Sequence, residues 1–465
     1  MEVCVAIFFA KKGLRQGDPL SPYLFTISME VLSRMLNRDL LVKAFKPHPQ
    51  THRIELTHLC FADDLLIFTR GTCGAVVVVK KILDAFSKIS SLNCNPSKSE
   101  IFCAGTDIAT QNLTVDATGF QIGQLPVRYL GIPLVAGKLT SIDCKVLVDK
   151  IAARLRGWGV RTLSYAGKLQ LVCSVIASIT QYWMNIIQLP AKVIKQIEKA
   201  CSDFLWDSEE EGKKAKIRWD RVALPKAEGG LRFKDLRSWN TACLIRNLWA
   251  IISNSSSLWA SWVRQYQLSY TSIWCIPPTI SCSWAWKKVV KVRVLAEGYL
   301  QARNNGVFWN GFHMERYYVT KVWETIRVKQ PQVPWCKLVW KSLCSPRDKH
   351  IIWLIIQDRI STLDKIQKWN AGIINLCPLC RSVPESRDHL FFDCIYSRNV
   401  MQVIPGSSSL LCNNWNDTLH LATTRYKTDT DSANYGRMVW MMLVSELWRE
   451  RCRRLYDTNL LQKNN

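Results

Sequence analysis

The sequence predicts an α+β fold: an antiparallel sheet with helices, followed by a largely helical region and a small metal-binding module. Three observations predict this fold. Apolar residues recur at helical spacing through residues 20–36, and strand-like segments flank a tight turn within residues 54–68. A cysteine–histidine cluster occupies residues 377–394.

The composition is that of a large, basic, globular chain. With 465 residues, of which 48% are hydrophobic, it can bury several cores and form about two to four domains. The 62 Lys and Arg outnumber the 37 Asp and Glu, which gives a formal charge of +25. Such a charge favours a polyanionic partner, nucleic acid before a membrane surface, although a solvated basic surface without function remains the alternative.

The cysteines and the N-terminus indicate a protein that is not secreted. The 18 Cys occur at irregular spacings, and the segment MEVCVAIFFAKKG has no basic n-region and no small-residue cleavage site. We therefore expect reduced thiols and a nuclear or cytoplasmic location. The apolar residues 169–187 are interrupted by polar ones about every fourth position, which predicts a buried helix and not a membrane span.

The expected elements can be placed along the chain. A helix is predicted at 20–36, two strands around a turn within 54–68, a helix at 76–92, a strand at 100–104 and a last helix at about 435–455. The pattern from 137 to about 300 is helical, with breaks at 207–216 (DSEEEGKKAK) and 253–257 (SNSSS).

The stretch CFADDLLIF places two adjacent carboxylates, Asp63 and Asp64, in an apolar run that favours burial. Buried carboxylates need a counter-charge. Mg²⁺ takes hard oxygen ligands, and two such ions about 4 Å apart promote nucleotidyl transfer in polymerases. An ordinary polar turn is the alternative interpretation of this pair.

The residues CPLCRSVPESRDHLFFDC contain Cys377, Cys380, His389 and Cys394 at the spacing C-x2-C-x8-H-x4-C. Three thiolates and an imidazole can close a tetrahedral Zn²⁺ site with no open position, which is structural in character. A redox pair and a chance spacing are the alternatives.

Four further stretches occur in the order found in a known family. GLRQGDPLSPYLF, FADDLLIF, FSKISSLNCNPSKSEIF and LPVRYLGIPL resemble reverse transcriptases of non-LTR (LINE-type) retrotransposons, most closely the plant branch. The segments 157–190 and 224–244 resemble the helical connection of the same family. The region 333–394 looks like its zinc-binding domain, so the resemblance covers nearly the whole chain.

The resemblance implies a role for each matching residue. Asp63 would be the principal Mg²⁺ ligand, Asp64 would lie beside it nearer the primer end, and Lys98 would be the general acid that protonates pyrophosphate. The remaining matches would bind nucleotide, template and primer. They are Arg15 as a phosphate contact, Gln16 and Gly17 in the nucleotide and template pocket, and Tyr129, Leu130 and Gly131 in the primer grip.

The resemblance also implies four parts: a partial palm at 1–136, a thumb-like helical connection at 137–305, a zinc-binding domain at 306–400 and a tail with one helix at 401–465. Ser91 departs from the family, which has Gly there, and should stiffen or shift that turn.

The family uses a third catalytic carboxylate on a strand tens of residues before the GLRQGDP loop. Met1 stands twelve residues before Gly13, so we expect an N-terminally truncated chain that lacks this strand and the fingers. The expected function is an RNA-directed DNA polymerase by family, inactive as this chain alone. A non-catalytic nucleic-acid-binding zinc protein and a decayed element remnant are the alternatives.

Overall fold

The structure is a computed structural model in which most of the chain can be described. The described residues are 17–41, 46–158, 163–206, 215–269, 271–277, 283–304, 306–404 and 414–462. They divide into two compact units, each made of two stretches of chain. Unit 1 is Met1–Asp143 with Cys243–Tyr318, and unit 2 is Cys144–Ala242 with Val319–Asn465. The predicted four-part division remains a prediction beside these two interleaved units.

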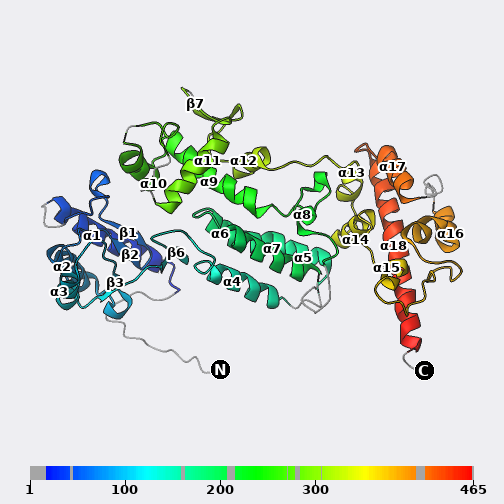
Figure 1. The fold of residues 1–465 in the computed structure, drawn as a ribbon, viewed down its shortest axis with the longest axis horizontal. Coiled ribbons are helices and arrows are strands. Elements are labelled where there is room, and N and C mark those ends of the chain that lie inside the picture. Colours follow the sequence, from blue (N-terminus) through cyan, green and yellow to red (C-terminus); the bar gives the residue numbers. More distant parts are fainter. Residues whose placement is uncertain are drawn as a thin grey trace, which may run out of the picture. The chain divides into compact units, whose positions relative to one another are not determined.

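Unit 1 combines helices with small sheets, in agreement with an α+β fold (Figure 1). Its first stretch contains α1 (Ser21–Leu41), β1 (His58–Phe61), β2 (Asp64–Ile67), α2 (Cys73–Ser90), β3 (Glu100–Ile101), α3 (Ile108–Thr118), β4 (Gln121–Ile122), β5 (Val127–Tyr129) and β6 (Ile132–Leu134). Its second stretch contains α10 (Leu258–Trp262), α11 (Trp284–Ala296), β7 (Leu300–Arg303), β8 (Gly306–Trp309) and β9 (Phe312–His313). The helix α9 (Leu236–Ile252) continues from unit 2 into unit 1.

The described strands form four separate small sheets. The pairs β1–β2 and β5–β6 are antiparallel hairpins, β3–β4 is a parallel pair, and β7–β8–β9 is an antiparallel three-stranded sheet. The predicted strand at 100–104 is therefore shorter than expected. It ends at Ile101, where its pairing with Ile122 ends.

The core under the first hairpin lies between α1 and α2. Its buried members are Leu32, Leu36, Val79, Ile82 and Phe86. Leu65 and Ile67, on one face of β2, pack against this cluster, so the alternation of the strand attaches the hairpin to both helices.

Unit 2 is helical in its described part. Its elements are α4 (Lys145–Arg156), α5 (Tyr165–Leu171), a π-helical turn (Val172–Ile176), α6 (Ala177–Met184), α7 (Ala191–Trp206), α8 (Trp219–Val222), α12 (Val319–Ile326), α13 (Cys336–Trp340), α14 (Pro346–Ile356), α15 (Leu363–Gln367), a second π-helical turn (His389–Asp393), α16 (Ile395–Val403), α17 (Trp415–Arg425) and α18 (Asp431–Gln462). No helix in the described ranges is both long and apolar enough to cross a bilayer.

Aromatic rings form a distinct part of the core of unit 2. Trp353 is fully buried, and Trp415 packs within 6 Å of Trp440 and of the ring of Phe391. Not every tryptophan of this region belongs to the core, since Trp369 is 73% exposed. Large rings supply much apolar area per residue, which suits a helical unit built from short elements.

Candidate functional site

The two adjacent aspartates lie at the tip of the β1–β2 hairpin. Phe61 pairs with Asp64, so Ala62 and Asp63 form a two-residue loop. Ala62 takes a φ of 52°, a left-handed conformation that costs a residue with a Cβ roughly 1–2 kcal/mol. The tight turn is as predicted, and it directs both carboxylates away from the core.

The expectation that these carboxylates are buried is wrong. Asp63 and Asp64 are exposed, and Phe61 beside them is 61% exposed. The apolar run does not bury the aspartates because only Leu65 and Ile67, in its second half, pack against the helices. Water solvates the two charges, so their presence in an apolar stretch requires no counter-ion for folding.

Polar contacts add to the apolar anchoring at the base of this hairpin. The His58 ring nitrogens lie 2.8 Å from the Ser33 hydroxyl on α1 and 2.7 Å from the Thr57 hydroxyl. Thr57 in turn donates to the Asn37 side chain at 2.9 Å. Burial lowers the pKa of His58, which favours the neutral ring that these hydrogen bonds use.

A second hairpin lies close to the first. Tyr129 and Ile132 pair across a two-residue loop in which Leu130 and Gly131 both have positive φ, 51° and 77°. This is the type I′ geometry that matches the twist of a hairpin, and it explains a glycine at the second loop position. The Asp64 carboxylate contributes to raising the pKa of Tyr129, after the larger effect of burial, so the two hairpins are near neighbours.

The other predicted polymerase residues are only partly placed. Gly17 is exposed with a φ of 88°, while Arg15 and Gln16 lie outside the described residues. Lys98 is exposed at the end of a 3₁₀ turn, and no hydrogen bond or ion pair joins it to either aspartate within the described ranges.

Ser91 occupies the position where a glycine was expected from the resemblance. It takes a φ of 62° after α2, and its N–H donates to the Ser87 carbonyl. A left-handed residue at a helix C-terminus favours glycine, so the serine keeps the turn at a cost in backbone strain.

The four predicted zinc ligands lie together in unit 2. The ligand atoms of Cys377, Cys380, His389 and Cys394 all lie within 4.8 Å of one another, and Cys380 Sγ is 3.4 Å from His389 Nε2. Three of these side chains are buried. Tetrahedral Zn²⁺ with Zn–S bonds of about 2.3 Å needs sulfurs roughly 4 Å apart, so the arrangement fits the ion.

Hydrogen bonds favour a thiolate at Cys394. The Cys377 thiol donates to Cys394, which lowers the pKa of Cys394 and raises the pKa of Cys377. Two backbone N–H groups also face each of these sulfurs. The described cysteines are free, and the set has no open coordination position, so it fits a structural Zn²⁺ site.

A buried ion pair supports this cluster and could not be predicted from the sequence. Glu385 lies between the two halves of the cysteine–histidine set and is fully buried. It accepts two hydrogen bonds of 2.8 Å from Arg451 on α18 and one of 2.7 Å from the Leu363 N–H. The partners are 66 and 22 residues away, and no local pattern joins them.

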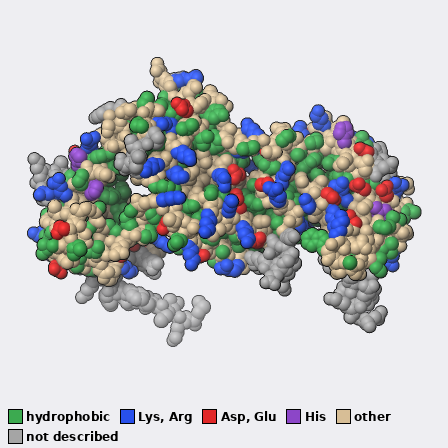
Figure 2. Space-filling view, viewed as in Figure 1, with side chains coloured by type: hydrophobic (Ala, Val, Ile, Leu, Met, Phe, Trp, Pro, Cys, Tyr) green, Lys and Arg blue, Asp and Glu red, His purple; other side chains and the backbone are tan. Residues whose placement is uncertain are grey.

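Basic side chains gather over the first helices of unit 2. On the face drawn in Figure 2, Lys and Arg outnumber Asp and Glu over the helices α4 to α8. A surface of this sign attracts phosphates and repels acidic partners.

Comparisons with known proteins agree with both parts of the site. Residues 4–134 match the reverse transcriptase (RNA-dependent DNA polymerase) family, and residues 317–400 match the family described as zinc-binding in reverse transcriptase. These matches contain the aspartate hairpin and the cysteine–histidine cluster, respectively.

The chain spans less than a third of the length of each of three curated relatives that it matches. A provisionally named ribonuclease H protein of Arabidopsis thaliana is 29% identical over 38% of this chain and 28% of the relative. A retrovirus-related Pol polyprotein from a type-2 retrotransposable element of Drosophila melanogaster is 32% identical over 28% of this chain and 12% of the relative. An uncharacterized 149 kDa protein of the transposon TX1 of Xenopus laevis is 25% identical over 42% of this chain and 15% of the relative.

Proposed function

From the premise that this is a retroelement protein with a reverse-transcriptase domain, we propose that unit 1 carries the palm of an RNA-directed DNA polymerase of the LINE type, plant branch. The observation that carries the proposal is the aspartate hairpin: two adjacent carboxylates, solvent-exposed at a tip whose strands are anchored to α1 and α2. The relative from Arabidopsis thaliana favours the plant branch. RNA template and DNA primer are the proposed partners.

Each part of the hairpin pair has a proposed task. Asp63 and Asp64 hold Mg²⁺, which when bound activates the primer 3′-oxygen and stabilises the leaving pyrophosphate. Tyr129, Leu130 and Gly131, on the neighbouring hairpin, position the primer end. Among the described residues, no atom lies within 4 Å of a Cβ built on Gly17, which is consistent with the proposed close approach of a nucleotide. Lys98, Arg15 and Gln16 keep the roles that the resemblance implies.

We expect that the chain alone does not extend a primer. Among the described residues, the cysteine–histidine cluster is the one group of three or more metal-binding side chains, so the hairpin tip offers two carboxylates for two ions. Each missing ligand weakens binding of the ions and charge stabilisation, and every tenfold loss in rate corresponds to about 1.4 kcal/mol of barrier.

The experiment separates metal binding from catalysis. The purified chain is titrated with Mn²⁺ as a spectroscopic substitute, and the same chain is given an RNA template, a DNA primer and Mg²⁺. We expect weak Mn²⁺ binding that Asp63→Asn abolishes and Asp116→Asn, at an exposed position of α3, leaves intact. Equal binding by both variants would contradict the role of the hairpin. Nucleotide incorporation that Asp63→Asn abolishes would overturn the inactivity and confirm the polymerase.

A second candidate function is a non-catalytic nucleic-acid-binding zinc protein. The basic helices of unit 2 together with the structural metal cluster favour it. Under this proposal, oligonucleotide binding is steeply salt-dependent and Asp63→Asn leaves it unchanged. The free cysteines among the described residues are consistent with a nuclear or cytoplasmic location, which we also propose.

A further inference from the structure

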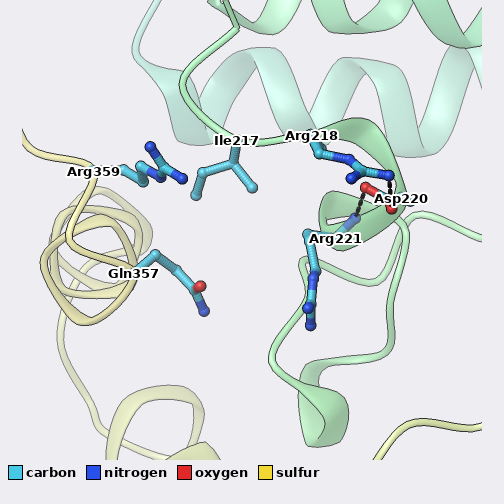
Figure 3. Close-up of a pocket in the computed structure, with 6 residues that line it drawn as sticks. All are labelled: Ile217, Arg218, Asp220, Arg221, Gln357 and Arg359. Atoms are coloured by element: carbon cyan, nitrogen blue, oxygen red, sulfur yellow. Dashed lines mark hydrogen bonds and ion pairs between the residues drawn. The ribbon is translucent and has the colours of Figure 1, made fainter.

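A pocket of about 430 Å³ lies within unit 2, and none of its lining residues belongs to the cysteine–histidine cluster. Six residues line it, from two segments far apart in the sequence: Ile217, Arg218, Asp220, Arg221, Gln357 and Arg359. Figure 3 shows Gln357 and Arg359 on the side formed by the end of α14, and the other charged residues on the side formed by α8.

The charges of this pocket do not cancel. Asp220 is paired with Arg218 at 2.8 Å and also accepts from the Arg221 N–H at 3.0 Å. The guanidinium groups of Arg221 and Arg359 have no ion-pair partner in the part of the chain that the structure describes. Three arginines against one aspartate leave the lining with a net charge of two positive units; the arginines are solvent-exposed, so their charge is open to an anion from solution.

The α14 side of the pocket is held in place by a helix-terminating motif. The Arg359 N–H donates to the Leu354 carbonyl at 2.8 Å, and the Asp358 N–H donates to the Ile355 carbonyl at 3.0 Å. Asp358 has a φ of 52°, so these bonds form a Schellman motif that sets where Arg359 leaves the helix. The Asp358 carboxylate binds Lys365 at 2.6 Å and is not used by Arg359.

The α8 side is attached to the same core. Ile217 and Val222 are buried, and Trp219 packs edge-on against Phe233 with ring centroids 4.9 Å apart. Trp353 on α14 donates to the Gly229 carbonyl at 2.8 Å, in the loop that follows α8. Both walls therefore belong to one packed body, which fixes the backbones that carry Arg221 and Arg359 relative to each other while their side chains remain exposed.

We propose that this pocket binds a phosphate of the nucleic-acid backbone, with Arg221 and Arg359 as its two cationic ligands and Gln357 as an amide donor. Guanidinium groups present paired N–H donors that match phosphate oxygens. The volume exceeds that of one phosphate and admits its sugar. The lining offers no aromatic ring for a base, so recognition is independent of sequence. The proposal rests on nucleic-acid binding by the chain, and it adds a specific contact site to it.

The test compares two double variants of equal charge. Arg221→Gln with Arg359→Gln alters the pocket, and Arg154→Gln with Arg347→Gln alters two exposed arginines of the same unit outside it. Binding of a 20-nucleotide single-stranded DNA is measured by fluorescence anisotropy between 50 and 200 mM KCl. We expect the pocket variant to lose about tenfold in affinity, with a slope of log K against log salt shallower by roughly one, while the control changes by less than about twofold.

A chemical readout locates the contact in the full chain. Phenylglyoxal modification of each arginine is quantified by mass spectrometry, with the oligonucleotide, with inorganic phosphate at matched ionic strength, or with neither. We expect the oligonucleotide to protect Arg221 and Arg359 and to leave Arg347 reactive. Protection by inorganic phosphate but not by the oligonucleotide would overturn the assignment to nucleic acid.

The outcomes distinguish this proposal from the proposed function. The wild-type chain could bind the oligonucleotide with the usual salt dependence while the pocket variant matches the control and neither arginine is protected. In that case the assignment of the pocket as a phosphate site is wrong and nucleic-acid binding stands. If the wild-type chain does not bind the oligonucleotide, both fail. Equal thermal unfolding of the variants and wild type ensures that the affinities compare folded proteins.

Discussion

His350 makes unit 2 sensitive to acid. Its ring lies among Tyr165, Trp206 and Trp353, with ring centroids 5.5, 6.3 and 5.5 Å away. Neither ring nitrogen has a hydrogen-bond partner among the described residues. Burial, with a smaller contribution from the charge of Lys216, lowers the pKa of His350 from 6.5 to about 4. The core therefore accepts the neutral ring and opposes the charged one.

The magnitude follows from the two pKa values. The unfolded chain binds the proton below its pKa of 6.5, whereas the folded chain does so only near 4, so stability is lost as pH falls through this window. At pH 5, protonation of His350 favours the unfolded chain over the folded chain by a factor of about 30. The free energy of unfolding is therefore roughly 2 kcal/mol smaller than at neutral pH. His350→Phe keeps an aromatic ring and removes the titration.

Urea unfolding at pH 7 and pH 5, followed by tryptophan fluorescence, measures this contribution. We expect the stability lost between the two pH values to be about 2 kcal/mol smaller in His350→Phe than in wild type. Acid also protonates the zinc ligands, but this affects both proteins and cancels in the difference. The same substitution at the exposed His420 on α17 should leave the wild-type pH dependence in place. If His350→Phe lost as much stability on acidification as wild type, the reasoning from burial would be refuted.

Three further substitutions test unit 2. Cys380→Ser should reduce bound zinc from about one ion per chain and lower the urea midpoint, because structural zinc contributes its binding energy to folding. Elemental analysis of freshly purified protein measures the metal. Arg451→Met leaves Glu385 buried and unpaired, so we expect a loss of about 3–5 kcal/mol in urea unfolding, most of which the double variant with Glu385→Gln recovers. Burial, followed by the charge of Asp235, raises the pKa of Glu198 to about 7, so stability falls as pH rises from 4.5 to 7. Glu198→Gln should then gain about 1 kcal/mol at pH 8 and little at pH 5, after allowance for solvent screening.

Specific results would contradict these expectations. If freshly purified wild-type protein contained no zinc, the assignment of the cysteine–histidine cluster as a zinc site would be wrong. An Arg451→Met variant as stable as wild type would show that Glu385 reaches water. A Glu198→Gln variant with the same gain at both pH values would point to packing instead of charge.

Turns, helices and short metal-ligand motifs could be predicted from the sequence because the interactions that form them join residues close in the chain. The Ala62–Asp63 turn and the Cys377–Cys380 pair each form within a few residues, where spacing alone determines geometry. The helix predicted at 76–92 is α2, at Cys73–Ser90, since its apolar period lies within one element. Pairings over long sequence distances were not predictable. The ion pair between Arg451 and Glu385, and the pocket that Arg221 and Arg359 both line, form only after the chain has folded.

The first helix shows where periodicity stops being informative. The apolar spacing of Leu20, Leu24, Ile27, Val31 and Met35 predicted an amphipathic helix; α1 forms as expected, and Met35 packs against its core. Yet the first four of these side chains are 64, 47, 63 and 39% exposed, while Leu32 and Leu36 are the buried members of the cluster shared with α2. A helix with apolar residues around much of its circumference has more than one face able to pack. The helical spacing of apolar residues does not show which of these faces is buried. The choice among them depends on which element lies opposite. For α1 the opposite elements are α2 and β2, and the residues that reach them are Met29, Leu32, Met35 and Leu36, not the predicted series from Leu20 to Val31.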